Sequence, residues 1–305
     1  MRLVYFGTSS FAVPALERLA PHVTLVVSQP DRPSGRGMET KRSEVSEAAL
    51  RLGLPLETPE KSRDADFIER LRLEDADAFV VASYGQILSR KLLAIPRNGC
   101  FNLHASLLPK YRGAAPIQYA VLNGDTVTGV TLMAMDAGMD TGDMIAKQET
   151  QIGPDETAGG LHDRLAAIAA ELVGQWVERL ATGEFPREPQ DEAQASYAPK
   201  VTKADAELDF DRPAKEEYDR FRAFTPVPGA WVATRAGQIK VKAASLGGRE
   251  TAVPSGTVVA TRPFEVAFST GTVVFESVQP EGRKAVSGVD FANGARIAPG
   301  DCLKP

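Results

Sequence analysis

Apolar and polar positions alternate along the first half of the chain in the pattern of successive βαβ units. Short apolar runs of strand length are followed by longer segments with helical spacing, which predicts a mostly parallel sheet covered by helices. The predicted strands cover residues 3–6, 23–28, 78–83, 100–103, 129–135 and 143–150, and the predicted helices cover 11–20, 42–52, 64–71, 115–122 and 157–182. We therefore expect an α/β fold with a Rossmann-like, doubly wound sheet.

The pattern changes after the long helix. Residues 183–200 are Pro-rich, charged and short of apolar side chains, which is typical of a linker. A further helix is predicted over 215–223, followed by short strand-like runs separated by Gly-containing turns, the pattern of a small OB-like β-barrel. The predicted domains are an α/β domain over 1–184, a linker over 185–203 and a C-terminal barrel over 204–305.

Composition narrows the class of protein. The chain has 305 residues, of which 43% are hydrophobic and 25% charged, as in ordinary globular proteins. No apolar run approaches the about 18 residues of a membrane span, and the start resembles a buried strand more than a signal peptide, so we expect a cytoplasmic protein without membrane association. Cys100 and Cys302 have neither a CxxC partner nor a nearby His, so we expect no structural metal.

The net charge of −5 conceals an asymmetry. Residues 220–304 hold 11 Lys and Arg against 6 Asp and Glu, whereas the rest of the chain holds 24 against 34. A basic tail of this kind attracts phosphate groups. The tail is therefore a candidate for contact with nucleic acid, although ordinary surface Lys and Arg on a small folding module are the alternative.

The densest candidate chemistry lies between residues 101 and 145. Asn102 and His104 are two apart at the end of a predicted strand, so both side chains point to the same face. An amide and an imidazole at the carboxyl end of a parallel strand suit a developing oxyanion, although a packed His with a turn-capping Asn is the alternative. Asp136, Asp140 and Asp143 lie among glycines in a later turn, and one of them could orient His104 and move a proton. The spacing does not say which one, and such turns are often purely structural.

Two loops flank this region, and several familiar motifs are absent. Residues 106–116 form a non-helical loop directly after the strand, where loops commonly wall a pocket. Residues 29–37 form a Gly/Pro/Arg loop that either contacts a phosphate chain or is simply solvated. The sequence holds no Walker motif, GxSxG or HExxH, and its dinucleotide fingerprint is incomplete, which disfavours a nicotinamide dehydrogenase.

Taken together, these motifs resemble the 10-formyltetrahydrofolate-dependent formyltransferases. The donor-related motifs are Asn102-x-His104, Ser106-Leu-Leu-Pro109, Tyr111-Arg-Gly-Ala-Ala-Pro-Ile117 and Asp136-x-Gly-x-Asp140-Thr-Gly-Asp143. The branch of the family that formylates methionyl-tRNA is similar in further blocks, among them Gln29-Pro-Asp-Arg-Pro, Gly35-Arg-Gly37, Tyr197-Ala-Pro-Lys-Val-Thr-Lys203 and Arg222-Ala-Phe-Thr-Pro226. Nearly the whole chain is covered by the resemblance.

The resemblance implies an enzyme that transfers the formyl group of 10-formyltetrahydrofolate to the α-amino group of initiator methionyl-tRNA, for translation initiation. The N-terminal domain would be catalytic and the barrel would bind tRNA, in a monomer that needs no metal and no obligate protein partner. The implied catalytic residues are Asn102, His104 and Asp140. The implied folate-binding residues are Ser106, Leu107, Leu108, Pro109, Tyr84, Gly85 and Ile87. The implied tRNA-binding residues are Arg32, Arg36, Lys41, Arg42, Lys240, Lys242, Arg283 and Lys284.

Three other functions share part of this pattern. An enzyme that formylates an amino sugar nucleotide would use the same three catalytic residues, but the arginine loop and the basic tail disfavour it. A hydrolase that releases formate from the same donor would use water in place of the amine. A non-catalytic RNA-binding protein would have no use for the Asn-x-His and Asp set.

Overall fold

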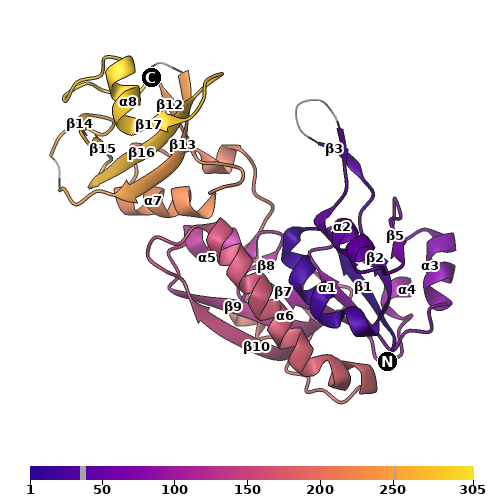
Figure 1. Ribbon diagram of the computed structural model, residues 1–305. Coiled ribbons are helices and arrows are strands. Elements are labelled where there is room, and N and C mark those ends of the chain that lie inside the picture. The colour runs from indigo at the N-terminus through magenta and orange to yellow at the C-terminus, as the bar shows by residue number, and fades with distance from the viewer. Residues whose placement is uncertain (35–38, 236, 251) are drawn as a thin grey trace. The chain divides into compact units, whose positions relative to one another are not determined.

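The computed structural model describes residues 1–34, 39–235, 237–250 and 252–305, and its chain divides into two compact units (Figure 1). The first unit contains Met1–Pro116, Val127–Thr150 and His162–Ala198, and the second contains Ile117–Thr126, Gln151–Leu161 and Pro199–Pro305. Arg36 lies outside the described residues. Within the described ranges, none of the helices combines the length and the apolar character that crossing a membrane requires.

A seven-stranded sheet forms the centre of the first unit. Its strands lie in the order β10-β9-β7-β6-β1-β2-β5. Their bounds are β1 (Leu3–Gly7), β2 (Val23–Val27), β5 (Leu56–Glu57), β6 (Ala78–Ala82), β7 (Cys100–His104), β9 (Val127–Ala134) and β10 (Met144–Gln151). β1 pairs in parallel with β2 and β6, and β6 pairs in parallel with β7, whereas β7 and β9 are antiparallel. The mostly parallel sheet that the hydrophobic pattern predicted is therefore confirmed.

Helices cover both faces of this sheet (Figure 1). On one face, Phe6 of β1 belongs to a core cluster with Leu71 and Leu92, which come from α3 and α4. On the other face, the Tyr5 hydroxyl donates to the carbonyl of Ala12, in the turn that leads into α1, at 2.6 Å. The helix bounds in this unit are α1 (Val13–Leu19), α2 (Glu44–Arg51), α3 (Ala65–Arg72), α4 (Arg90–Leu93) and α6 (Ala158–Thr182), which belongs to the unit from His162 on. Because β1 is apolar at every position, it can be buried on both faces, as a central parallel strand must be.

The segment after α6 packs onto the first unit. β11 (Tyr197–Ala198) pairs in parallel with β8 (Arg112–Gly113), and Phe185 packs edge-on against Phe101 with ring centroids 5.0 Å apart. Composition presented this stretch as a linker because few of its residues are apolar, but backbone and polar hydrogen bonds hold it. The predicted domain limits at residues 184 and 203 remain predictions.

The second unit contains a six-stranded antiparallel sheet and the helices α7 (Ala214–Ala223) and α8 (Gly288–Gly294), and α5 (Pro116–Leu122) belongs to this unit from Ile117 on. The strands β12-β13-β16-β15-β14 lie in this order, and β17 pairs with β16. Their bounds are β12 (Trp231–Thr234), β13 (Gly237–Leu246), β14 (Val258–Thr261), β15 (Phe264–Ala267), β16 (Thr272–Pro280) and β17 (Val286–Ser287). Phe264, Phe268 and Phe275 fill its core together with Tyr218 and Phe221 of α7. This arrangement confirms a C-terminal β domain, while closure into a barrel remains a prediction.

Candidate active site

Strand β7 presents two polar side chains on one face, as its two-residue period predicted. Phe101 and Leu103 are buried, while Asn102 is half-buried and His104 is only 5% exposed. β7 lies between β6 and β9, and His104 is the last residue of the strand, paired with Thr131. The two side chains therefore lie at the carboxyl end of a strand inside the sheet, where open α/β sheets bind ligands.

Asp140 joins these two side chains. Its Oδ2 atom lies 3.6 Å from His104 Nδ1, and its Oδ1 atom accepts a hydrogen bond from Asn102 Nδ2 at 3.4 Å. The backbone N–H of Gly113 also donates to Oδ2, at 2.9 Å. The sequence left three candidate carboxylates, and the geometry selects Asp140. We refer to Asn102, His104 and Asp140 as the Asp140 cluster.

The other two carboxylates of the turn have different partners. Asp136 accepts hydrogen bonds from the Thr141 hydroxyl, at 2.8 and 2.9 Å, and from the backbone of Gly138. The carboxylate of Asp143 lies 3.7 Å from a guanidinium nitrogen of Arg187. Asp136 therefore shapes the turn, and Asp143 contacts an exposed cation.

Both nitrogens of the His104 ring face hydrogen-bond acceptors. Nε2 lies 2.9 Å from the carbonyl oxygen of Tyr111, and because a carbonyl can only accept, Nε2 carries a hydrogen. Nδ1 faces the Asp140 carboxylate, so a second proton can lie between that ring nitrogen and Asp140. His104 is thus arranged to exchange a proton with Asp140. With the ring in this position, donation to an oxyanion would require it to leave the Tyr111 carbonyl, whereas Asn102 has a second amide hydrogen available.

In the loop after β7, several of the predicted folate-binding residues make contacts within the protein. The Ser106 hydroxyl donates to the carbonyl of Lys110 at 2.6 Å. Thr131 accepts from the backbone N–H of Leu108 at 3.0 Å and donates to the carbonyl of Ser106 at 2.7 Å. The Leu108 side chain packs in a core cluster with two methionines. The predicted folate-binding side chains that stay partly exposed in this loop are those of Leu107 and Pro109.

The segment after β6 contains a buried hydroxyl without a partner. The Tyr84 ring is 2% exposed, and its hydroxyl makes no hydrogen bond within the described part of the chain. Burial raises the pKa of Tyr84 to about 12, so the hydroxyl stays protonated and can donate. Gly85 and Ile87 beside it are exposed, Ile87 by 88%. An unsatisfied buried hydroxyl next to exposed residues is what a site for a partly polar ligand would contain.

The turn that carries Asp140 is supported by three residues to which the sequence assigned no role. Arg112 is fully buried, and its guanidinium donates two hydrogen bonds to Glu192, at 2.8 and 2.9 Å, and one to the side-chain oxygen of Gln190, at 2.9 Å. The Gln190 amide nitrogen donates in turn to the carbonyls of Asp140 and Gly142. The contact with Arg112 lowers the pKa of the Glu192 carboxyl. We refer to Arg112, Gln190 and Glu192 as the support cluster.

Three of the predicted tRNA-binding residues of the first unit, Arg32, Lys41 and Arg42, lie in or directly after a pair of short strands. β3 (Arg32–Ser34) pairs with β4 (Glu39–Lys41), so the backbone of Arg32 lies opposite Lys41. Lys41 forms an ion pair with Glu44 at 3.1 Å, and Arg42 lies 3.8 Å from Asp31. The side chain of Arg32 is outside the described residues. Both described cations are exposed and have an acidic neighbour.

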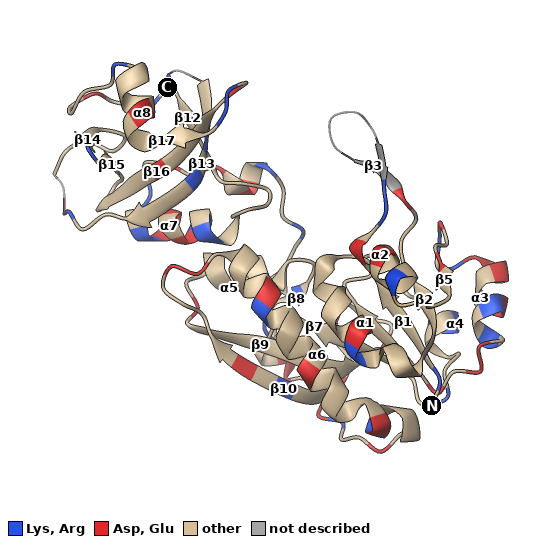
Figure 2. Cartoon of the chain, in the orientation of Figure 1, with Lys and Arg blue, Asp and Glu red and all other residues tan. Residues whose placement is uncertain are grey.

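The predicted tRNA-binding residues of the second unit form an exposed cluster. Lys240 and Lys242 alternate with buried residues of β13, so both point outward. Lys240 pairs with Gln279 of β16, and the Gln279 amide donates to the carbonyl of Arg283 at 2.9 Å, which brings the turn carrying Arg283 and Lys284 near Lys240. Within the described ranges, none of these four cations forms an ion pair, and Figure 2 shows Lys and Arg along β13. We refer to Lys240, Lys242, Arg283 and Lys284 as the basic face.

The basic face is a local feature of the second unit. Residues 117–126, 151–161 and 199–305 together hold 15 Lys and Arg against 16 Asp and Glu. The excess counted from residue 220 is therefore offset by acidic residues elsewhere in the unit, and α7 carries both signs (Figure 2). Any attraction of phosphate groups has to come from the arrangement of charges and not from the net charge of the unit.

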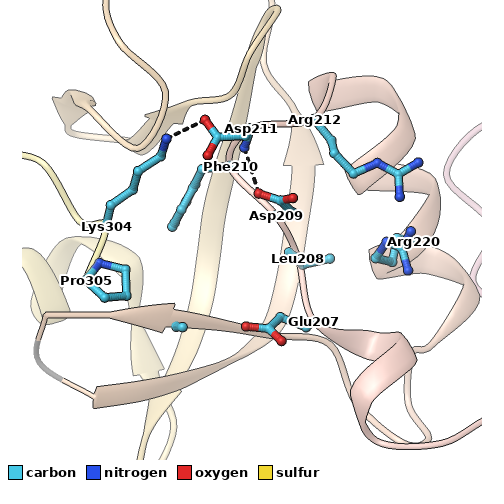
Figure 3. A pocket seen from close by; sticks show the side chains of 10 residues that line it. Glu207, Leu208, Asp209, Phe210, Asp211, Arg212, Arg220, Lys304 and Pro305 are labelled. Carbon is cyan, nitrogen blue, oxygen red and sulfur yellow. Dashed lines mark hydrogen bonds and ion pairs between the residues drawn. The ribbon is translucent and has the colours of Figure 1, made fainter.

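A pocket of about 500 Å³ lies in the second unit (Figure 3). Its lining includes Arg212, Arg220 and Lys304, but each of these cations already has an acidic partner. Lys304 pairs with Asp211, and both arginines contact the buried Glu217. No free cation is left for an anionic ligand among these lining residues. In the ranges that the structure describes, no group of three or more His, Cys, Asp or Glu is placed to hold a metal ion.

Comparison with known proteins gives matches over almost the whole chain. The family model described as formyl transferase matches residues 1–177, and the model described as its C-terminal domain matches residues 200–296. The methionyl-tRNA formyltransferase of Geotalea uraniireducens is 42% identical, covering 99% of this chain and 98% of that protein. The methionyl-tRNA formyltransferase of Solibacter usitatus is 43% identical, with 99% and 98% covered.

Solved structures share the fold at low sequence identity. An N-formyltransferase from Helicobacter canadensis, in a complex with folinic acid and dTDP-3-aminofucose, gives a TM-score of 0.68 at 19% identity, covering 90% of this chain and 98% of that one. HypX from Aquifex aeolicus, in a complex with tetrahydrofolic acid, gives 0.65 at 14% identity, covering 100% of this chain and 49% of that one. These likenesses extend over both units of the chain.

Proposed function

The chain belongs to the formyl transferase family, and we propose that it transfers a formyl group from 10-formyltetrahydrofolate to the α-amino group of initiator methionyl-tRNA. The resemblance on which the sequence analysis rested, and the class of enzyme that it implied, are thereby confirmed. The observation that carries the proposal is the contact of Asp140 with both Asn102 and His104 at the carboxyl end of β7.

Asn102 is the residue best arranged to stabilise charge on the formyl oxygen. When an amine attacks a formyl carbon, negative charge develops on that oxygen, and a fixed amide donor lowers the barrier most when it is already in place. One Asn102 hydrogen is used on Asp140, which fixes the amide, and the other has no acceptor among the described residues and can donate to a substrate. Loss of one such donor typically costs about 10²–10³ in rate.

His104 and Asp140 provide the route for the proton. The attacking amine has to lose a proton, and the nitrogen that loses the formyl group has to gain one, because it would leave slowly as an anion. Asp140 lies beside Nδ1 of His104, so the pair can take up a proton and return it without a large movement. An α-amino group titrates near about 8, so a substantial part of it is neutral at physiological pH and needs no further activation.

The folate would be held by residues at the ends of β6 and β7. The donor supplies the electrophilic formyl group when it is bound. Tyr84 fits such a ligand because its buried hydroxyl is a donor without a partner among the described residues, and Gly85, Ile87, Leu107 and Pro109 offer exposed or partly exposed surface. Ser106 and Leu108 contribute to this site by holding the loop in place.

The acceptor tRNA would be attracted by exposed cations. The basic face offers four exposed positive charges on β13 and the turn after β16, none of them in an ion pair within the described ranges, and phosphate contacts of this kind release counterions and strengthen binding at low salt. Lys41 and Arg42 would contribute from the first unit. A monomer that works in the cytoplasm remains our prediction.

The experiment that tests the proposal compares acceptors. The purified protein is incubated with 10-formyltetrahydrofolate and either initiator methionyl-tRNA, an amino sugar nucleotide or no acceptor. We expect formylmethionyl-tRNA in the first reaction and little product in the others. Formylation of the sugar nucleotide alone, or release of formate that does not depend on an acceptor, would reject the proposed acceptor.

A further inference from the structure

The backbone that carries Asp140 adopts a conformation that needs outside support. Asp140 has φ +55°, in the left-handed region that few residues other than glycine adopt. Such a conformation persists only where its surroundings hold it. The Gln190 amide nitrogen does so by donating to the carbonyl of Asp140 at 2.7 Å and to that of Gly142 at 2.8 Å, which uses both of its hydrogens.

The Gln190 amide is itself held in one orientation. Its oxygen accepts from Arg112 Nε at 2.9 Å, so the amide nitrogen faces the two carbonyls of the turn. Arg112 is fixed in turn by its two hydrogen bonds to Glu192 and by the backbone pairing of β8 with β11. The residue after Arg112 donates its own N–H to the Asp140 carboxylate. Gln190, oriented by Arg112, therefore holds the backbone of Asp140, and Gly113 holds its side chain.

We propose that Gln190 is a positioning residue for formyl transfer, which acts by setting where the Asp140 carboxylate lies relative to His104. The inference rests on the proposed function for its kinetic part. In the part of the chain that the structure describes, Gln190 contacts the Asp140 cluster only through the backbone of the turn, so its effect on the reaction passes through Asp140. A displacement of about 1 Å in such a group can cost about 10² in rate.

Kinetic measurements test the proposal through a double-mutant cycle. We expect Gln190→Ala to lower kcat by about 10- to 100-fold, with the KM of both substrates changed by less than about threefold. If Gln190 acts through Asp140, the same substitution in an Asp140→Asn background should cost little more, whereas general loosening of the fold would add its cost to that of Asp140→Asn. Additive losses would overturn the proposal.

A matched control lies four residues further along. Gln194 is exposed, and its amide donates within its own turn, to Asp191 at 2.8 Å. We expect Gln194→Ala to keep the wild-type kcat and melting temperature. Equal losses in Gln190→Ala and Gln194→Ala would mean that the segment is only structural, and would also overturn the proposal.

Nitrogen NMR of the imidazole rings gives a measurement that needs no substrate. The chain has three histidines, so the ring resonances of His22, His104 and His162 can be assigned by substitution. In the intact Gln190→Ala variant we expect the His104 resonances to shift in the direction seen in Asp140→Asn, with the other two unchanged. Unchanged His104 resonances would overturn the positioning role. If the wild-type protein showed no formyl transfer, the proposed function would be rejected, but the NMR measurement would still test how Gln190 affects Asp140 and His104.

Discussion

The Asp140 cluster and the basic face are built on opposite principles. Around Asp140, nearly every polar atom has a protein partner within hydrogen-bond distance, down to the backbone N–H of Gly113 and the amide of Gln190. On the basic face, four cations are exposed, and none of them forms an ion pair in the described part of the chain. The Asp140 cluster holds a few atoms in defined positions, whereas the basic face presents positive charges on side chains that no ion pair in the described part of the chain holds in place.

This difference has a kinetic consequence. Fixed donors and a held carboxylate stabilise charge that appears only during the reaction, so their loss should lower kcat. Exposed cations attract phosphate groups at long range and equally before and during the reaction, so their loss should raise KM and change its dependence on salt. The comparison is therefore testable by asking which kinetic parameter each substitution changes.

The largest effect is expected at the centre of the Asp140 cluster. Asp140→Asn removes the proton acceptor beside His104, and His104→Ala removes its partner, so we expect kcat to fall by about 10³ or more in each. The KM for methionyl-tRNA and the melting temperature should stay close to wild type. Asp143→Asn is the matched control, since this carboxylate contacts Arg187 and not His104. Near-normal turnover in Asp140→Asn would remove the distinction between the two regions.

A somewhat smaller effect is expected at Asn102. Asn102→Ala removes the amide that we place at the formyl oxygen while leaving the proton route intact, so we expect kcat to fall by about 10²–10³. Single-turnover rates with saturating substrates separate this loss from weaker binding. A raised KM with unchanged kcat would mean that the amide only binds substrate.

The sequence was informative for the Asp140 cluster wherever neighbours along the chain decided the outcome. Asn102 and His104 share a face because they are two apart on a strand, and the run after them was identified as a loop by its prolines. Asp140 lies 36 residues from His104, and periodicity could not distinguish it from Asp136 or Asp143; only the resemblance did so. In the structure, hydrogen bonds from Asn102 and the backbone of Gly113 single out Asp140.

The support cluster could not be predicted from the sequence. Arg112 and Gln190 are 78 residues apart, and their contact depends on the pairing of β8 with β11, two strands of two residues each. Strands this short leave no hydrophobic period, and the segment that holds Gln190 is rich in proline and poor in apolar residues. A composition typical of a linker concealed a stretch that hydrogen bonds hold to the site.

For the second unit, the sequence predicted the elements better than the charge. Short apolar runs separated by glycine turns identified the strands, because alternation alone decides which residues enter the core. Lys and Arg exceed Asp and Glu only in the part of the second unit after residue 219. Over the whole unit, positive and negative side chains nearly balance. The basic face exists because the register of β13 on β16 brings Lys240 beside the turn of Arg283.

An intermediate effect is expected on the basic face. Replacing Lys240, Lys242, Arg283 and Lys284 by Gln should lower kcat/KM for methionyl-tRNA by about 10- to 100-fold through KM, with kcat unchanged. The negative slope of log kcat/KM against log salt concentration should become shallower by about 3, since each phosphate contact contributes about −0.7 to −0.9 to it. Arg262→Gln, an exposed cation of the same unit outside the basic face, is the control and should leave the slope unchanged. A loss of kcat would show that these residues reach the chemistry.

The smallest effect is expected at Asp205, a residue of the second unit. Its charge is held by hydrogen bonds, whereas the charges of the basic face are not held by ion pairs in the described part of the chain. The backbone N–H and the hydroxyl of Thr202 donate to Asp205, both at 2.7 Å, and lower the pKa of its carboxyl below the ordinary 3.8. A lowered pKa contributes stability above the ordinary value, and this contribution is lost as pH falls through the lower one. Asp205→Asn should therefore reduce the free energy of unfolding at pH 7, by at most about 1 kcal/mol because the carboxylate is exposed. The reduction should be smaller in acid, where the wild-type carboxyl is protonated as well. Thermal melts across pH check this, with Glu250→Gln as an exposed control; an equal loss at every pH would mean that the charge of Asp205 plays no part.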